Sequence, residues 1–259
     1  MPRGICKLCL LEKDLQRSHL MGRALYKILR ENDGDDPIVM TPKLVTHTSR
    51  QVRDYVLCKS CEDRFSKNGE AYFGTLVARK NGFPLLDKLR LALAHREEKG
   101  YAEFSGDRIG VDTDKLAYFA LSALWRSGAH KWSTLAGQTT SVDLGHYTEV
   151  LRKFLLGETQ FPSDVAVIVT VCMDKGSQGF IFMPGQVREA KPDIQYTLAV
   201  LGIELRVIVG IPASRLETVC CFHSANKVLF RRNCHKEAQQ GFNYLHKTAK
   251  ISERVRRKA

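Results

Sequence analysis

The sequence predicts an α+β protein whose C-terminal part carries a mainly antiparallel sheet. Apolar residues recur at helical spacing in residues 22–31, 115–126 and 144–156. Short runs rich in β-branched residues follow one another from residue 165 onward, as in consecutive strands of an antiparallel sheet. In addition, two C-x-x-C pairs lie in the first quarter of the chain, which is typical of a small metal-stabilised module.

The N-terminal elements can be placed in order along the chain. The helix predicted at residues 22–31 should end at the acidic, Gly- and Pro-containing segment 32–37. Residues 38–57 are expected to be extended. A helix should start near Cys61, and Pro84 fits the first turn of another.

The second half of the chain begins with the two further helices and then changes to strands. Gly157 is a suitable C-cap for the second helix. Gly202 is expected near the turn between two paired strands. The strand-like runs lie at residues 165–173, 179–183, 194–211 (a pair), 216–223 and 227–230.

These elements divide the chain into four regions. A cysteine-bearing module is expected at residues 1–80, a connecting helix and linker at 81–110, an α+β domain at 111–230, and a basic C-terminal helix or tail at 231–259. Through its C-terminal domain the protein could bind a protein partner, bind a controlling ligand or form a homo-oligomer. The sequence does not separate these three roles.

The net charge of +12 makes polyanions the first class of partner to consider. Residues 227–259 hold ten Lys or Arg and two Glu, so 10 − 2 = +8 of the excess lies there. Such a stretch either contacts phosphates or is only a solubilising end. No stretch resembles a membrane span or a secretory signal, so we expect a cytoplasmic protein in a reducing compartment with no membrane partner.

Cysteines in a reducing compartment are more often metal ligands than disulfide partners. Cys6, Cys9, Cys58 and Cys61 supply four soft thiolates, which is what a closed tetrahedral structural zinc site requires. The 48 residues between the two pairs must hold structure of their own. The other four cysteines are expected to be free thiols; a second metal site around Cys220, Cys221, His223, Cys234 and His235 is the alternative.

The order of these residues resembles a known family. A C-x-x-C pair, a histidine about ten residues later, and a second C-x-x-C that opens a helix resemble the zinc-stabilised HNH endonucleases. The resemblance covers roughly residues 1–80. More narrowly, the chain resembles a group of bacterial HNH-like proteins, which the segments 120–126 and 144–152 fit weakly. The resemblance implies a treble-clef-like ββα-metal module, and cleavage of DNA phosphodiesters.

The resemblance assigns roles to particular residues. It implies that His19 is the general base that takes a proton from water. It also implies that Glu62, directly after the second pair, helps to hold a catalytic Mg²⁺ or Mn²⁺. Ser18 occupies the place of an acidic metal ligand in many HNH enzymes, and the middle Asn of the motif has no clear counterpart. His47 is a secondary candidate on an extended segment.

Three functions follow from these residues. The leading one is a metal-dependent endonuclease, which the resemblance associates with phage defence. The alternative is a non-catalytic, zinc-dependent nucleic-acid-binding or regulatory protein derived from the same fold, in which His19 packs or hydrogen-bonds locally. A third is a protein-interaction adaptor whose basic tail contacts acidic partners. Trp125 is expected in the core and not as a stacking platform.

Overall fold

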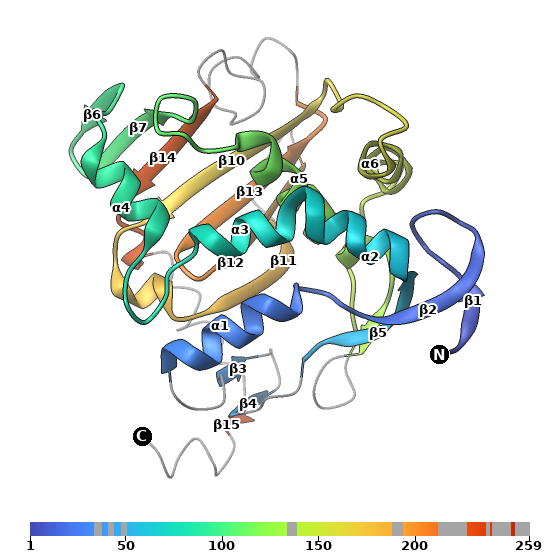
Figure 1. Cartoon of the computed structure of the whole chain (residues 1–259). Coiled ribbons are helices and arrows are strands. Elements are labelled where there is room, and N and C mark those ends of the chain that lie inside the picture. The colour runs from blue at the N-terminus through green and yellow to red at the C-terminus, as the bar shows by residue number, and fades with distance from the viewer. Residues whose placement is uncertain are drawn as a thin grey trace.

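The chain folds as a mixed α+β protein around one large sheet (Figure 1). The computed structural model describes residues 1–33, 38–40, 44–47, 51–133, 139–187, 194–211, 227–236, 239, 250 and 251. The expected strand at 216–223, with Cys220, Cys221 and His223, lies outside the described residues. So does the side chain of His47, whose backbone belongs to a short strand.

The large sheet has seven strands and is antiparallel except at one place. Strands β10 and β14 run parallel, and every other neighbouring pair is antiparallel. In spatial order the strands are β11 (Ile181–Val187), β12 (Ile194–Val200), β13 (Ile203–Val209), β10 (Val165–Cys172), β14 (Val228–Arg232), β7 (Tyr101–Ser105) and β6 (Arg96–Glu98).

The β12–β13 hairpin confirms the turn expected at Gly202. Leu201 and Gly202 both have positive φ, 48° and 92°, which characterises the type I′ turn that matches the strand twist. A side chain at position 202 would also collide with Phe83, 2.6 Å from the place of a Cβ. Glycine is therefore required there for two reasons, the backbone conformation and the close approach of the Phe83 ring.

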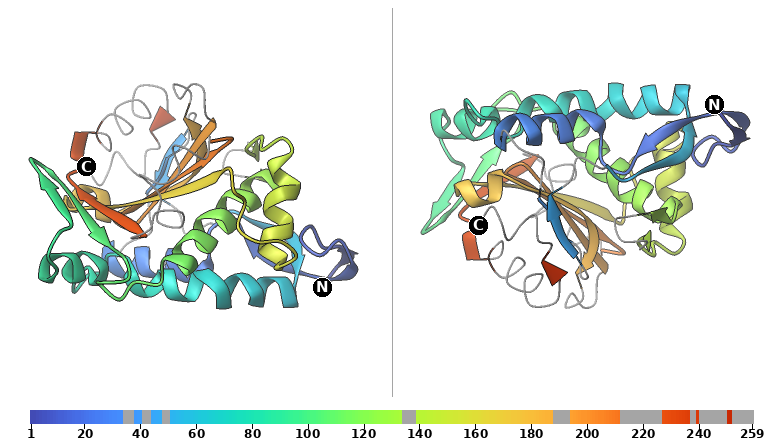
Figure 2. Two further views of the ribbon diagram at one scale, coloured as in Figure 1. Left: turned by 90° about the horizontal axis from the view of Figure 1, so that it is seen from above. Right: turned by 90° about the horizontal axis from the view of Figure 1, so that it is seen from below.

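Helices cover one face of this sheet in two layers. Helix α5 (Thr113–Ala129) lies between the sheet and a continuous helical rod, as two views agree (Figures 1 and 2). The rod consists of α2 (Lys59–Phe65), a turn of π-helix η1 (Ser66–Glu70) and α3 (Ala71–Leu76). Because α5 is enclosed on both sides, most of its residues are buried.

Three of the remaining helices lie close to the expected positions, and η3 (Lys175–Gln178) was not expected. Pro84 is the first residue of α4 (Pro84–Leu91). The N–H groups of the first helical turn have no partner within the helix, so proline costs no hydrogen bond at this position. Gly157 ends α6 (Tyr147–Leu156) in the left-handed conformation, φ 77°. Helix α1 is Arg23–Asp33.

A small sheet of order β1–β2–β5 stands at one end of the molecule (Figure 1). Strands β1 (Arg3–Ile5), β2 (Glu12–His19) and β5 (Arg53–Cys58) pair antiparallel, and α2 starts directly after β5. The other short strands are β3 (Ile38–Met40), β4 (Leu44–His47), β15 (Lys250–Ile251), β8 (Trp132–Ser133) and β9 (Thr139–Thr140).

The two halves of the described chain share a single main core. One cluster of buried apolar side chains runs from Cys6 in the N-terminal module to Leu229 in β14. Residues 81–110, expected to form a connecting helix and linker, contain α4 and the two strands at one end of the sheet. Arg231 and Arg232 of the basic C-terminal stretch lie in β14 and form ion pairs with Glu97 and Glu204.

Both edges of the large sheet carry residues that disfavour further pairing. Strand β6 has only three residues, Arg-Glu-Glu, and all are exposed. At the other edge, β11 contains Pro184, and its register with β12 shifts between Phe182 and Gly185. Short charged strands, proline and bulges are the devices by which proteins protect sheet edges.

Cys172 and Cys234, which we expected to be free thiols, form a disulfide. The parallel pairing of β10 with β14 places Cys172 opposite Arg232, two residues before Cys234, so the Cα atoms come within 5.4 Å. Disulfides are less usual in a reducing compartment, and the cytoplasmic location stays a prediction. In the described part of the chain, no helix combines the length and apolar character needed to cross a bilayer.

The contact between η1 and α5 gives a stability prediction. A methyl group on Gly69 would come 2.9 Å from the Phe119 nitrogen, so Gly69→Ala should lower the free energy of unfolding by about 1–3 kcal/mol. Gly74, on the same rod, has nothing within 4 Å of a Cβ, so Gly74→Ala should raise it by about 0.5–1 kcal/mol. Chemical denaturation measures both; equal stability of the two variants would contradict this packing.

Candidate metal centre and adjoining charged site

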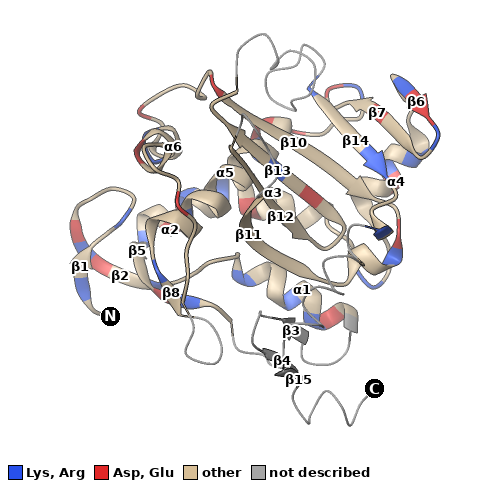
Figure 3. Cartoon of the chain, turned by 180° about the vertical axis from the view of Figure 1, so that it is seen from behind, with Lys and Arg blue, Asp and Glu red and all other residues tan. Residues whose placement is uncertain are grey.

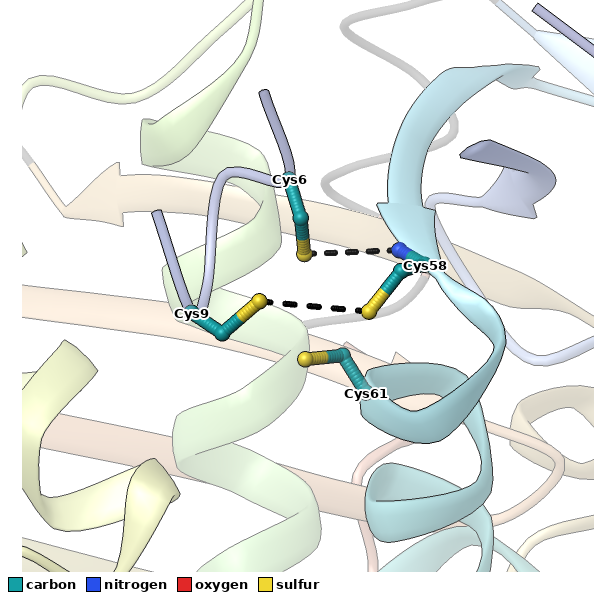
Figure 4. Close-up of side chains that lie close together, drawn as sticks. All are labelled: Cys6, Cys9, Cys58 and Cys61. Atoms are coloured by element: carbon teal, nitrogen blue, oxygen red, sulfur yellow. Dashed lines mark hydrogen bonds between the residues drawn. The ribbon is translucent and has the colours of Figure 1, made fainter. Parts of the chain in front are cut away.

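The four cysteines of the two C-x-x-C pairs come together at the base of the small sheet. Their sulfurs all lie within 4.8 Å of one another and point toward a common centre (Figure 4). Cys6 and Cys9 come from the loop after β1, Cys58 ends β5, and Cys61 lies in the first turn of α2. Cys9 is half-buried and the other three are buried.

The backbone shapes the first pair into a tight turn. The Leu10 amide donates to the Cys6 carbonyl at 2.9 Å, and Leu10 takes a left-handed conformation with φ 59°. The Lys7 amide donates to the Val56 carbonyl at 3.1 Å, which fastens this turn to β5. The Cys58 amide donates to the Cys6 sulfur at 3.3 Å. The chain thus holds the first pair against the second by backbone bonds.

Hydrogen bonding between these thiols shifts their pKa values in opposite directions. The hydrogen bond with Cys61 is the main cause that lowers the pKa of Cys6 to about 4, and the same bond raises the pKa of Cys61. One thiolate is therefore favoured within the cluster. Four convergent thiols with backbone N–H donors fit a tetrahedral zinc ion, which takes sulfur ligands at about 2.3 Å.

His19 is the last residue of β2, opposite Arg53 of β5. Its Nε2 is buried and has no hydrogen-bond partner among the described residues. Burial, followed by the charges of Arg53, Arg23 and Arg126, lowers the pKa of His19 below its ordinary value of 6.5. The imidazole is therefore neutral at pH 7, the form that can accept a proton.

Glu62 lies one residue after Cys61, in the first turn of α2. Burial raises the pKa of Glu62, while Arg126 and a hydrogen bond with the Ser18 side chain act in the opposite direction. Its Oε2 is 3.9 Å from Arg126 Nη2, and its buried Oε1 has no partner in the described part of the chain. Ser18, directly before His19, is itself buried and accepts the Leu57 amide at 3.0 Å.

Arg126 is the buried cation of this site, with a side chain only 2% exposed. It reaches out of α5, forms an ion pair with Glu70, and lies 4.6 Å from the centre of the Phe65 ring. The end of α5 is fixed by the indole nitrogen of Trp132, which donates to the Arg126 carbonyl at 2.8 Å. The Nε and Nη2 atoms of Arg126 have no hydrogen-bond acceptor among the described residues.

The π-helical turn explains how Glu62 and Glu70 reach the same guanidinium. Residues eight positions apart on a regular α-helix point about 80° apart. The wider turn at η1 reduces the rotation per residue, which brings Glu70 back toward the face of Glu62. Turns of this kind are frequent at functional sites.

Of the residues that the sequence singled out, the structure brings the four cysteines together, while the roles of His19 and Glu62 stay predictions. Sequence reasoning did not point to Glu70 or to the ion pairs of Arg126. A signal was present for Arg126, because it is a charged residue within the apolar helical run Ala120–Ser127. A charge in such a place must have a buried partner. Only the fold identifies that partner, which lies 56 residues earlier in the chain.

A hard divalent ion has no ligand cluster at this site. Within the described residues, the four cysteines are the only group of three or more His, Cys, Asp or Glu side chains close enough to share a metal ion. Glu62 and Glu70 face a guanidinium instead, and a guanidinium neutralises carboxylates that a cation would need. The side chains described at this site therefore do not fit a catalytic Mg²⁺ or Mn²⁺. Comparisons with protein-family models, with curated proteins and with solved structures found no match to this chain.

The thiol cluster predicts the metal content. Elemental analysis of the purified protein should find about one zinc per chain, and Cys58→Ser should lose the zinc and much of the thermal stability. The control is the double variant Cys172→Ser/Cys234→Ser, which removes the disulfide and should keep the zinc. A folded, zinc-free wild type or a zinc-loaded Cys58→Ser would contradict the assignment.

Removal of the buried cation should be costly. Arg126→Met leaves Glu62 and Glu70 without their counter-charge, so the free energy of unfolding should fall by about 3–5 kcal/mol. Arg64→Met is the matched control, because Arg64 is an exposed arginine of α2, where a change should stay within about 0.5 kcal/mol. Similar losses in both variants would contradict a special role for Arg126.

Proposed function

We propose that this protein is a zinc-stabilised, HNH-like endonuclease that hydrolyses nucleic-acid phosphodiesters, with His19 as the general base. The observation that carries the proposal is the geometry of His19, which ends β2 with a buried Nε2 that has no partner among the described residues. Burial, which lowers the pKa of His19, favours the neutral form that can accept a proton. Buried polar atoms are rarely left unpaired, and those that are often belong to functional sites. A water molecule at this nitrogen would supply the missing partner and the nucleophile.

The local arrangement supports the family resemblance. Two antiparallel strands, β2 and β5, lead into α2, with one cysteine pair before β2 and the other at the β5–α2 junction. This is the order of elements that a treble-clef-like ββα module requires. A zinc ion on the four thiolates would fix both strands and the helix, and thereby the position of His19 relative to Glu62.

In the proposed reaction His19 accepts the proton of water, and two arginines balance the charge of the phosphate. His19 Nε2 takes a proton from water, and the water oxygen forms a bond to phosphorus. The P–O bond to the leaving sugar oxygen breaks, and that oxygen takes a proton from solvent. Arg23 and Arg53, whose charges already act on His19, would balance the negative charge of the phosphate during this step.

A second function is favoured by one observation. Glu62 and Glu70 are paired with Arg126, so the carboxylate expected to hold Mg²⁺ or Mn²⁺ is already neutralised within the protein. This arrangement favours a protein that binds nucleic acid without cleaving it. The zinc module would then serve only to present a basic surface.

A cleavage assay separates the two functions. Plasmid, linear duplex and single-stranded DNA are incubated with the full chain in Mg²⁺, in Mn²⁺, and without added metal. The nuclease proposal expects cleavage that His19→Ala lowers by about 10²–10⁴-fold and that His95→Ala, a change of an exposed histidine outside the site, leaves intact. Absence of cleavage in all three conditions, or full activity of His19→Ala, would favour the binding function.

The charges around His19 predict the pH dependence of cleavage. A base must be unprotonated, so activity should fall as pH drops through the pKa of His19, which lies below 6.5. In Arg53→Gln one repelling charge is lost, the imidazolium becomes easier to form, and the acidic limb of kcat/KM should move to higher pH. An unchanged limb in Arg53→Gln would indicate that another group controls it.

A further inference from the structure

The outer face of the β2–β5 pair presents two arginines, a tyrosine and His19. In an antiparallel pair, residues directly opposite each other share a face. Arg17 lies opposite Tyr55, and His19 lies opposite Arg53. Residues two apart on a strand also share a face, so all four residues lie on one side of the strand pair, where His19 is half-buried with its Nε2 buried and the other three are exposed. We call these residues the Tyr55 face.

The Tyr55 face is open to solvent although it carries a large aromatic ring. Tyr55 is 43% exposed, and Arg17 and Arg53 are also exposed. On the opposite face of the same strands, Ser18 and Val56 are each only 1% exposed. The alternation is that of a strand pair with one face packed on the core and the other free. The ring therefore adds nothing to the core.

The Tyr55 face carries arginines that have no carboxylate partner among the described residues. In the part of the chain that the structure describes, neither Arg17, Arg53 nor the nearby Arg23 forms an ion pair with a carboxylate. Among residues 17–19 and 53–56 the one carboxylate is Asp54, which lies on the other face opposite Ser18, with its Oδ2 2.8 Å from His130 Nε2. The Tyr55 face is therefore a cationic surface built around an exposed aromatic ring.

We propose that the Tyr55 face binds single-stranded nucleic acid, with one unpaired base stacked on Tyr55 and the flanking phosphates on Arg17 and Arg53. Every base has a π-face that an exposed tyrosine can stack on, and guanidinium groups bind phosphate oxygens. In a duplex the base faces are covered by their neighbours, so the ring would have nothing to stack on. The chemistry thus selects an unpaired strand.

This inference deepens the proposed function, because it names the substrate form that would lie beside His19. His19 and Arg53 are directly opposite each other, so a phosphate bound at Arg53 would sit next to the imidazole. Binding does not itself require the chemistry of His19. A variant can therefore lose cleavage and still bind single strands, or lose binding of single strands and still cleave.

Binding by the full chain is measured by fluorescence anisotropy, in buffer without added divalent metal. The probes are labelled oligothymidylate and oligouridylate of about 12 nucleotides, and a duplex of the same length. We expect Tyr55→Ala to weaken binding of the single strands at least about tenfold, and Tyr55→Phe to restore it. Leu91→Ala, a change of a 91% exposed side chain on α4, is the control and should bind as the wild type does.

The arginines are tested by the salt dependence of the same binding. Arg17→Gln should weaken binding and reduce the slope of log affinity against log salt by about 1. Stronger binding of the DNA or of the RNA strand identifies the source of the ligand, and either supports the proposal. Unchanged binding in Tyr55→Ala, or an equal loss for duplex and single strands, would overturn it.

His19→Ala distinguishes this inference from the proposed nuclease. If single strands still bind His19→Ala through Tyr55 but the wild type cleaves nothing, the nuclease proposal fails and the binding face stands. If the wild type cleaves duplex DNA and Tyr55→Ala binds and cleaves as well as the wild type, the binding face fails and the nuclease proposal stands.

Discussion

The buried ion cluster of Arg126 with Glu62 and Glu70 is the constraint on which the arrangement of the N-terminal module depends. A guanidinium cannot be left without partners inside a protein, and its partners must be at hydrogen-bonding or ion-pair distance. This requirement fixes the rotation and height of the α2–η1–α3 rod against α5. Since α2 also carries Cys61, the same cluster fixes the thiol site relative to the large sheet.

The charged site joins two parts of the sequence that look independent. The strands and cysteines come from the first 65 residues, whereas the central cation comes from a helix of the α+β region. The charge of Arg126 helps to lower the pKa of His19, and Glu62 forms an ion pair with Arg126. The electrostatic state of the candidate base is thus set partly by the C-terminal half of the protein.

Figure 3 shows that elsewhere basic and acidic residues are mixed along α1 and around β1 and β2.

Local sequence patterns predicted most of the main helices and strands. Apolar spacing placed α1, α5 and α6, and β-branched runs placed β10 and the β12–β13 hairpin, because these elements bury faces that the residues themselves define. The doubled C-x-x-C spacing likewise located the thiol cluster, since each pair can reach one centre without help from distant residues.

What could not be predicted depends on contacts between distant residues. The parallel β10–β14 pairing decides that Cys172 meets Cys234, and no local signal specifies that pairing. The partnership of Arg126 with Glu70 needs the π-helical turn. The Tyr55 face depends on register: β2 and β5 slip between Gln16 and Arg17, and this irregularity sets which β5 residue lies opposite Arg17.

The protected edges of the large sheet have a consequence for the protein at high concentration. Strand β10 contains no charged residue at all, and such a segment would template intermolecular β-structure if it lay at an edge. It lies instead in the middle of the sheet, while the two edges are a short charged strand and a strand interrupted by proline and a bulge. Edge-to-edge addition at the large sheet is therefore disfavoured in the native state. Aggregation would require the interior strands to separate first, so resistance to it should follow global stability.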